Sequence, residues 1–215
     1  MPRQGASAPI PAVGQDGAPR SRRGLRTRAT LIGAARTVFE RDGYLDARIT
    51  DIAKEAGVAA GSFYTYFDGK EEIFAALVET VQEDMLHPHV RERPEGDGAA
   101  AQIDAANREY LRAYKRNVRL MALFEQVAQI DEEFEVLRRK RGHAFITRNT
   151  NLIRRLQEEG KADTDIDPRV TALALSTMVS RMAYLVFVLG ERIPFERLLE
   201  NLNMIWVNAL RLEEP

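Results

Sequence analysis

The stretch "TDIAKEAGVAAGSFYTYFDGKEEIF", residues 50–74, decides how the first part of the chain folds. Apolar residues recur at helical spacing up to Gly57, a residue type that adopts the left-handed backbone of a tight turn without strain. A further helix is predicted for residues 60–67, where small residues come first and aromatic residues follow. The pattern is therefore a helix, a glycine turn and a second helix, an arrangement that can place its second helix in the major groove of DNA.

Residues 59–67 divide between DNA contact and packing. The small residues at 59–62 leave room for a close approach to base edges, and Thr65 points outward with a hydroxyl and a methyl group. Phe63 and Phe67 lie four positions apart and share a buried face, whereas the Tyr64 hydroxyl can reach a phosphate. These four rings are a quarter of the sixteen in the chain (nine Phe, six Tyr and one Trp), and a purely structural origin for all four is the alternative.

The preceding residues predict a basic tail and a first helix. Residues 1–24 are rich in Pro, Ala, Gly and Arg and hold almost no large apolar side chains, which is typical of a disordered segment. The run "RSRRGLRTR", residues 20–28, is either a solvated linker or an arm that contacts phosphates. Its candidate contacts are Arg22 and Arg26. A helical pattern starts at Arg26, and Gly43 is expected to end it.

Charge is unevenly distributed although the net charge is only −1. Residues 1–70 hold eleven Lys and Arg against seven Asp and Glu, whereas residues 71–215 hold twenty against twenty-five. This asymmetry favours a polyanionic partner for the first part alone. The chain has no cysteine and only three scattered histidines, so neither a metal site nor a cofactor is expected.

One apolar run, residues 170–189, is long enough to span a bilayer. Arg181 near its centre would cost roughly 2.5–3.5 kcal/mol on insertion scales, and the preceding Asp-Pro pair at 167–168 is a typical helix start. The run is therefore interpreted as a buried helix. Because residues 1–20 also lack the apolar core of a secretory segment, a cytoplasmic protein without a membrane partner is expected.

Periodicity predicts further helices, at residues 73–85, 99–117, 120–129, 132–159, 168–189 and 195–212. The helix at 132–159 contains "RRKR", residues 138–141, which is interpreted as a solvated face because glutamates lie one turn earlier. The last helix carries a wide apolar stripe, which indicates burial on more than one side. A symmetric homodimer through residues 168–212 would supply the second side.

Residues 50–74, with "AARTVFERDGYLDARI" before them (residues 34–49), resemble the DNA-binding head of the TetR (tetracycline repressor) family. The resemblance lies in "IA-x-x-AGV", "G-x-x-Y-x-Y-F" and "K-E" at fixed spacing. It implies an all-α fold of about nine helices, with a three-helix head at residues 25–70 and a ligand-binding and dimerisation domain at residues 71–215. It also implies a cytoplasmic homodimer that binds double-stranded operator DNA and releases it when a small molecule binds.

The resemblance assigns DNA contacts to individual positions of the head. Small or hydroxyl residues face the groove, and aromatic and basic residues contact phosphates. The candidates are Arg22, Arg26, Arg48, Gly61, Ser62, Tyr64, Thr65, Tyr66 and Lys70. Two positions depart from the family pattern, because Arg48 and Ala59 stand where a hydroxyl residue usually caps a helix. Weaker pre-organisation of both helix starts is expected, with Thr50 as an alternative start for the second helix.

The family's ligand pocket lies among the fifth to eighth helices, where this chain has aromatic and methionine side chains with few polar ones. The candidate ligand-binding residues are Tyr110, Tyr114, Phe124, Phe145, Asn149, Met178, Arg181 and Met182. Such walls suit a small apolar effector. Arg181 either pairs with an acidic group of that effector or has a structural role, with Glu125 or across the dimer seam as its partner.

The function these observations favour is a ligand-responsive transcriptional regulator, a repressor, that binds a palindromic operator as a homodimer. The alternative is a dimeric small-molecule binding or interaction protein whose head has lost DNA affinity, which Arg48 and Ala59 favour. An enzyme is not expected, because the chain has no cysteine, no convincing His–acid pair and no Gly-rich phosphate loop.

Overall fold

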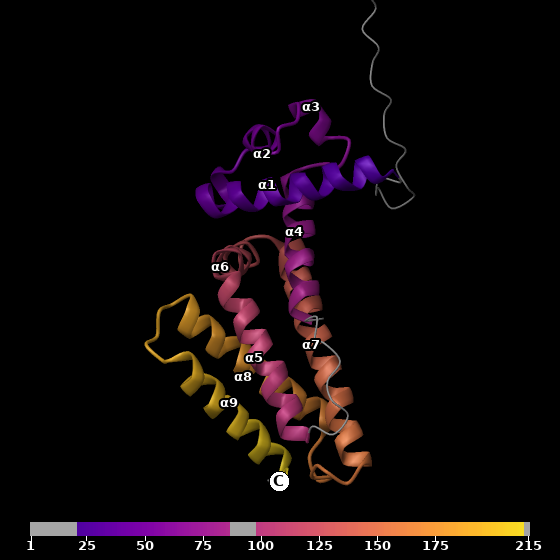
Figure 1. Ribbon diagram of the computed structural model, residues 1–215, viewed down its shortest axis with the longest axis vertical. Coiled ribbons are helices and arrows are strands. Elements are labelled where there is room, and N and C mark those ends of the chain that lie inside the picture. Colours follow the sequence, from indigo (N-terminus) through magenta and orange to yellow (C-terminus); the bar gives the residue numbers. More distant parts are fainter. Residues whose placement is uncertain (1–20, 87–97, 213–215) are drawn as a thin grey trace, which may run out of the picture. The chain divides into compact units, whose positions relative to one another are not determined.

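The computed structural model describes residues 21–86 and 98–212, and every regular element within them is an α-helix (Figure 1). This confirms the predicted all-α class. The chain divides into two compact units between Glu79 and Thr80. The division lies inside helix α4, whereas the sequence placed it at the start of that helix.

The head is built on α1 (Arg22–Asp46), which begins earlier than predicted. The hydroxyl of Ser21 accepts a hydrogen bond from the backbone N–H of Gly24 at 3.0 Å, so the helix is capped and already includes Arg22. The predicted disordered tail therefore does not extend to residue 24. Its residues 1–20 lie outside the described part of the chain.

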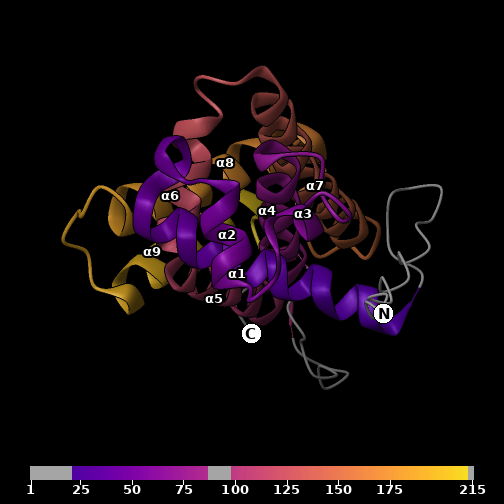
Figure 2. The ribbon, with the colours of Figure 1, turned by 90° about the horizontal axis from the view of Figure 1, so that it is seen from above.

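The head is completed by α2 (Ile49–Glu55) and α3 (Ala60–Phe63), and α2 packs against α1 in both views (Figures 1 and 2). Gly57 has φ 67°, as a glycine turn requires. Helix α3 ends at Phe63, four residues before the predicted end, because the chain passes into a turn at Tyr64. Phe63 and Phe67 are nonetheless both buried, with ring centroids 5.7 Å apart.

The two predicted cap losses are confirmed. Arg48 and Ala59 occupy the N-cap positions of α2 and α3, and neither side chain caps its helix. Thr50 does not act as an alternative start, because α2 already begins at Ile49. The predicted stop at Gly43 is a kink instead: its φ of 79° breaks the helical geometry, and the helix resumes to end at Asp46.

The remaining helices agree with the predicted segments to within a few residues, and they are α4 (Lys70–Leu86), α5 (Ala99–Arg116), α6 (Val118–Val127), α7 (Glu132–Glu158), α8 (Pro168–Phe187) and α9 (Phe195–Leu210). In the second unit α8 packs against both α7 and α5, and α9 packs against α5. Asp167 caps α8, since its carboxylate accepts from the backbone N–H of Val170 at 2.7 Å.

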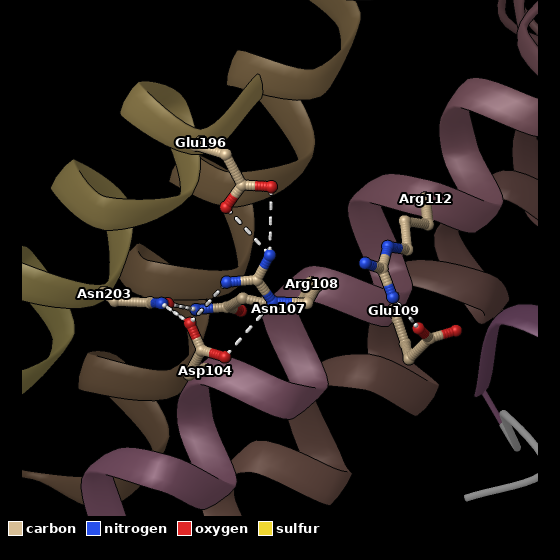
Figure 3. A network of polar contacts seen from close by, with 7 residues as sticks. All are labelled: Asp104, Asn107, Arg108, Glu109, Arg112, Glu196 and Asn203. Atoms are coloured by element: carbon tan, nitrogen blue, oxygen red, sulfur yellow. Dashed lines mark hydrogen bonds and ion pairs between the residues drawn. The ribbon is translucent and has the colours of Figure 1, made fainter. Parts of the chain in front are cut away.

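Helix α9 is fixed on α5 by a network of polar side chains (Figure 3). Arg108 bridges Asp104 of its own helix and Glu196 of α9, with N–O distances of 3.3 and 2.8 Å. Asn203 donates to Asp104 at 2.7 Å and accepts from Asn107 at 2.9 Å. Because each contact between the two helices joins one particular residue of α5 to one of α9, together these contacts fix the position of α9 along α5.

Helix α8 is less buried than predicted. By length and composition it could cross a membrane, yet only 22% of its most apolar 18-residue stretch is buried. Val170 and Leu173 are 64% and 49% exposed, and Met204 and Ile205 of α9 are 59% and 45% exposed. The interpretation of α8 as a buried helix is therefore wrong for one of its faces, because α5 and α7 cover only part of its surface.

Candidate DNA-binding surface and ligand cavity

The exposed side of the head gathers the predicted groove-facing residues in one short segment. Gly61 and Ser62 are exposed on α3, Tyr64 is 59% exposed just after it, and Thr65 and Tyr66 are partly exposed. Beneath them, the ring of Phe63 meets that of Tyr64 edge-on, with centroids 5.5 Å apart. The buried phenylalanine thus holds the tyrosine with its ring outward. Small, hydroxyl and phenolic groups are all accessible here.

Arginines at the start of α1 lie beside the end of α2 and the glycine turn that follows it. Arg22 and Arg26 line a shallow hollow with Ala56 and Val58, the residues around the glycine turn. Arg23 lines the same hollow and was not among the candidates, although it belongs to the same basic run. Their guanidinium groups give the surface beside the turn a positive charge. Such a charge favours phosphate.

Lys70 has a different environment from the one its predicted role suggests. Its ammonium donates to the backbone carbonyls of Tyr44 and Leu45 at 2.9 and 3.1 Å and lies 4.8 Å from the centroid of the Tyr44 ring. Those carbonyls belong to the C-terminal end of α1, the negative end of its dipole. Lys70 therefore joins the start of α4 to the end of α1. An ammonium has three donors, so one is left for a phosphate.

Arg48 precedes α2 and is exposed, so its side chain is accessible to a polyanion. Another arginine of the head, Arg28, lies over the Phe67 ring at 4.9 Å and supports the same aromatic core from outside. A cation–π contact of this kind is worth about 0.5–1 kcal/mol where it is exposed.

The second unit contains a cavity of about 230 Å³ among α4 to α9. Five of the eight predicted ligand-binding residues line it, and they are Tyr110, Tyr114, Phe124, Phe145 and Asn149. Tyr110 packs edge-on against Phe145 with centroids 5.3 Å apart. Burial raises the pKa of Tyr110 and of Tyr114, so both phenols stay neutral and can donate hydrogen bonds at physiological pH.

The other three predicted residues lie elsewhere. Met178 and Met182 line a separate hollow between α8 and the start of α9, together with Leu198 and Leu202. Arg181 is exposed, and its guanidinium lies 5.0 Å from the centroid of the Tyr184 ring. The structure thus does not bring Arg181 together with the lining of the cavity.

Arg141 and Trp206 are among the residues of the cavity lining that were not predicted. Arg141 is only 6% exposed, so the interpretation of "RRKR" as a solvated face is wrong for its last residue. Helical phase could have revealed this, because residue 141 falls on the same stripe of α7 as the apolar residues 134 and 145. Burial lowers the pKa of Arg141, although the guanidinium remains charged.

Two family models match the chain. The model of bacterial regulatory proteins of the tetR family matches residues 31–77, and the model of the C-terminal domain of the transcriptional regulator EthR matches residues 103–211. EthR from Mycobacterium tuberculosis is 24% identical over 208 residues, which cover 93% of this chain and 96% of that protein. TtgR from Pseudomonas putida is 24% identical over 152 residues, covering 65% and 71%.

A higher identity is found over a shorter match. The HTH-type transcriptional regulator YdgC from Bacillus subtilis is 43% identical over 56 residues, which are 26% of this chain and 29% of that protein. Among solved structures, the fatty acid degradation regulator FadR from Bacillus halodurans has a TM-score of 0.73 at 18% identity, covering 87% of this chain and 97% of that chain. Salmonella enterica GusR has a TM-score of 0.71 at 20% identity, covering 87% and 96%. These structures share the fold.

Proposed function

Because the chain belongs to the TetR family of transcriptional regulators, we propose that it is a cytoplasmic repressor that binds a palindromic operator as a homodimer and is released by a small molecule. The observation that carries the DNA-binding part is the exposed segment from Gly61 to Tyr66, with Arg22 and Arg26 beside the glycine turn. The small residues would approach base edges, while the tyrosines and arginines would hold phosphates.

The homodimer is supported by the apolar surface of the last two helices. Val170 and Leu173 of α8 and Met204 and Ile205 of α9 are all at least 45% exposed in the single chain. A twofold axis through residues 168–212 would cover these side chains in both protomers. It would also present two heads to half-sites one helical turn, about 34–36 Å, apart.

Release would follow from a difference in affinity. A ligand that occupies the cavity of about 230 Å³ and binds the DNA-free conformation more tightly lowers DNA affinity by the ratio of its two binding constants. A ligand with equal affinity for both conformations would bind without releasing DNA.

The test is selection of genomic fragments by the purified full-length protein, followed by binding titrations at several salt concentrations. Enrichment of one palindrome, with affinity falling steeply as salt rises, is expected. A folded dimer that enriches no sequence and shows no salt-dependent DNA binding would contradict the proposal.

That negative result is the outcome expected of the second candidate, a dimeric small-molecule binding protein with a weakened head. The missing caps at Arg48 and Ala59 favour it, as does the engagement of the Lys70 ammonium by backbone carbonyls. The two candidates differ in DNA binding alone, since both retain the cavity.

A further inference from the structure

The cavity contains a buried cation without an anionic partner among the described residues. The guanidinium of Arg141 contacts the sulfur atoms of Met121 and Met85, at 3.2 and 3.0 Å, and its central carbon lies 5.6 Å from the centroid of the Phe124 ring. Thioether sulfurs are weak acceptors. A buried charge normally requires an ion pair and strong hydrogen bonds, and in the described structure this one has no ion pair and donates only to thioether sulfur.

A second donor in the same lining also lacks a partner. Trp206 is 2% exposed, and its indole nitrogen has no hydrogen-bond partner among the described residues. Trp206 lies one turn after Asn203, whose bonds to α5 hold that part of α9 in place. Buried indole N–H groups usually find an acceptor. The lining therefore contains a guanidinium and an indole N–H to which the described residues give no oxygen acceptor.

The other charged groups of the lining point to the sign of that occupant. Arg138 lines the cavity along with Arg141, whereas Glu125 is its only acidic lining residue within the described chain. Glu125 is already 3.5 Å from Arg138. The remaining lining combines aromatic, aliphatic and methionine side chains with five uncharged polar ones, which are Asn107, Asn149, Ser176, Thr177 and Ser180. An anion with an apolar body matches both properties.

We propose that the cavity binds a small carboxylic acid, whose carboxylate pairs with Arg141 and whose apolar body lies among Tyr110, Phe124 and Phe145. This inference rests on the proposed ligand site and names the chemical class that it takes. A carboxylate suits the guanidinium because two parallel N–H···O bonds match its planar fork. A cavity of about 230 Å³ limits the acid to a small one.

The test compares acids with their neutral amides on the full-length protein. The probes are octanoate and 4-phenylbutanoate, each against its primary amide, and the signal is the intrinsic fluorescence of Trp206, the one tryptophan of the chain. Amide and acid have nearly the same shape, so a difference in affinity reports the charge. The acids are expected to bind at least about tenfold more tightly than the amides.

Two variants separate the buried guanidinium from general charge effects. Arg141→Met removes the charge and keeps an unbranched side chain, and it is expected to abolish the preference for the acids while still binding the amides. Arg139→Met removes the same charge from an exposed position two residues earlier that does not line the cavity, and it is expected to leave the preference intact. The wild-type comparison of acid with amide stands even where Arg141→Met does not fold.

Equal affinity for acid and amide, a preference that survives in Arg141→Met, or no fluorescence response of the folded wild type to either acid would overturn the proposal. DNA binding is measured separately on the same preparations by fluorescence anisotropy. A preference for acids in a protein that binds no DNA would uphold the carboxylate site and reject the repressor. DNA binding without that preference would do the reverse.

Discussion

At the starts of α2 and α3, single side chains determine how well the helices of the candidate DNA-binding surface are organised. Arg48 and Ala59 provide no oxygen to accept from the first backbone N–H groups of these helices. Helix α3 has only four residues, so each unpaired N–H is a large share of its backbone bonding. The absent caps therefore affect stability more than they would in a long helix.

Replacing Ala59 with serine is expected to stabilise the protein by about 0.5–2 kcal/mol, because a hydroxyl at the N-cap can accept from the N–H groups of the first turn. Urea unfolding followed by circular dichroism measures the change. Ala60→Ser is the matched control, since residue 60 is exposed and already within the helix. Equal effects of the two serines would show that the cap is not the cause.

Tyr64→Phe isolates one hydroxyl of the candidate DNA surface. The ring and its packing on Phe63 remain, and the 59% exposure of Tyr64 makes loss of stability small. A hydrogen bond to a charged phosphate is worth about 1.5–3 kcal/mol, so DNA affinity is expected to fall about tenfold or more. Anisotropy titration checks this, with Tyr184→Phe as the control outside the head. Unchanged affinity would remove Tyr64 from the DNA contacts.

At the scale of elements, the two glycines of the helix–turn–helix respond oppositely to the same change. Gly57 has φ 67°, whereas Gly61 is helical and has open space where a Cβ would lie. Gly57→Ala is expected to destabilise the protein by about 1–2 kcal/mol. Gly61→Ala is expected to stabilise it by up to about 1 kcal/mol. Thermal unfolding gives both signs, and a destabilising Gly61→Ala would contradict the assignment of residue 61 to a regular helix.

The network between α5 and α9 makes a second prediction at this scale. Asn203→Ala removes one partner each from Asp104 and the buried Asn107, and a cost of about 1–3 kcal/mol is expected. Asn201→Ala is the control, because its exposed amide donates to the carbonyl of Arg197 in its own helix. Urea unfolding of both variants gives the comparison. A similar loss of unfolding free energy in the two variants would mean that the network contributes little to stability.

The positions of most helices could be predicted from the sequence. Apolar periodicity and the Asp-Pro pair at 167–168 located the helices to within a few residues, because those signals are local. Gly43 was misread because a positive φ permits a kink as well as an end. Arg141 was missed because a charged run predicts solvation, and its burial depends on the packing of α4, α6 and α7 around it. Arg181 stood out for its apolar neighbours, yet the sequence does not say which face of α8 is covered.

At the scale of the whole molecule, the exposed face of α8 and α9 carries a prediction about assembly. Leu173→Glu places a charge at a position that is 49% exposed in the single chain and covered in the proposed dimer. Analytical ultracentrifugation is expected to show a shift from dimer to monomer, since an unpaired charge is costly in an apolar interface. Ile130→Glu, at a 68% exposed residue between α6 and α7, should leave the dimer unchanged. A wild type that sediments as a monomer would contradict the proposed interface.

In the proposed dimer, the same exposed face would link the protein's abundance in the cell to the strength of its control over transcription. A protomer whose apolar helices are covered only by a second copy is most stable when protomers are plentiful, by mass action. Where most copies are monomers, the concentration of dimer rises with the square of the protomer concentration. A doubling of expression would then increase the DNA-competent form about fourfold. The surface chemistry of two helices would in this way set how sharply the regulated genes respond to the dosage of their regulator.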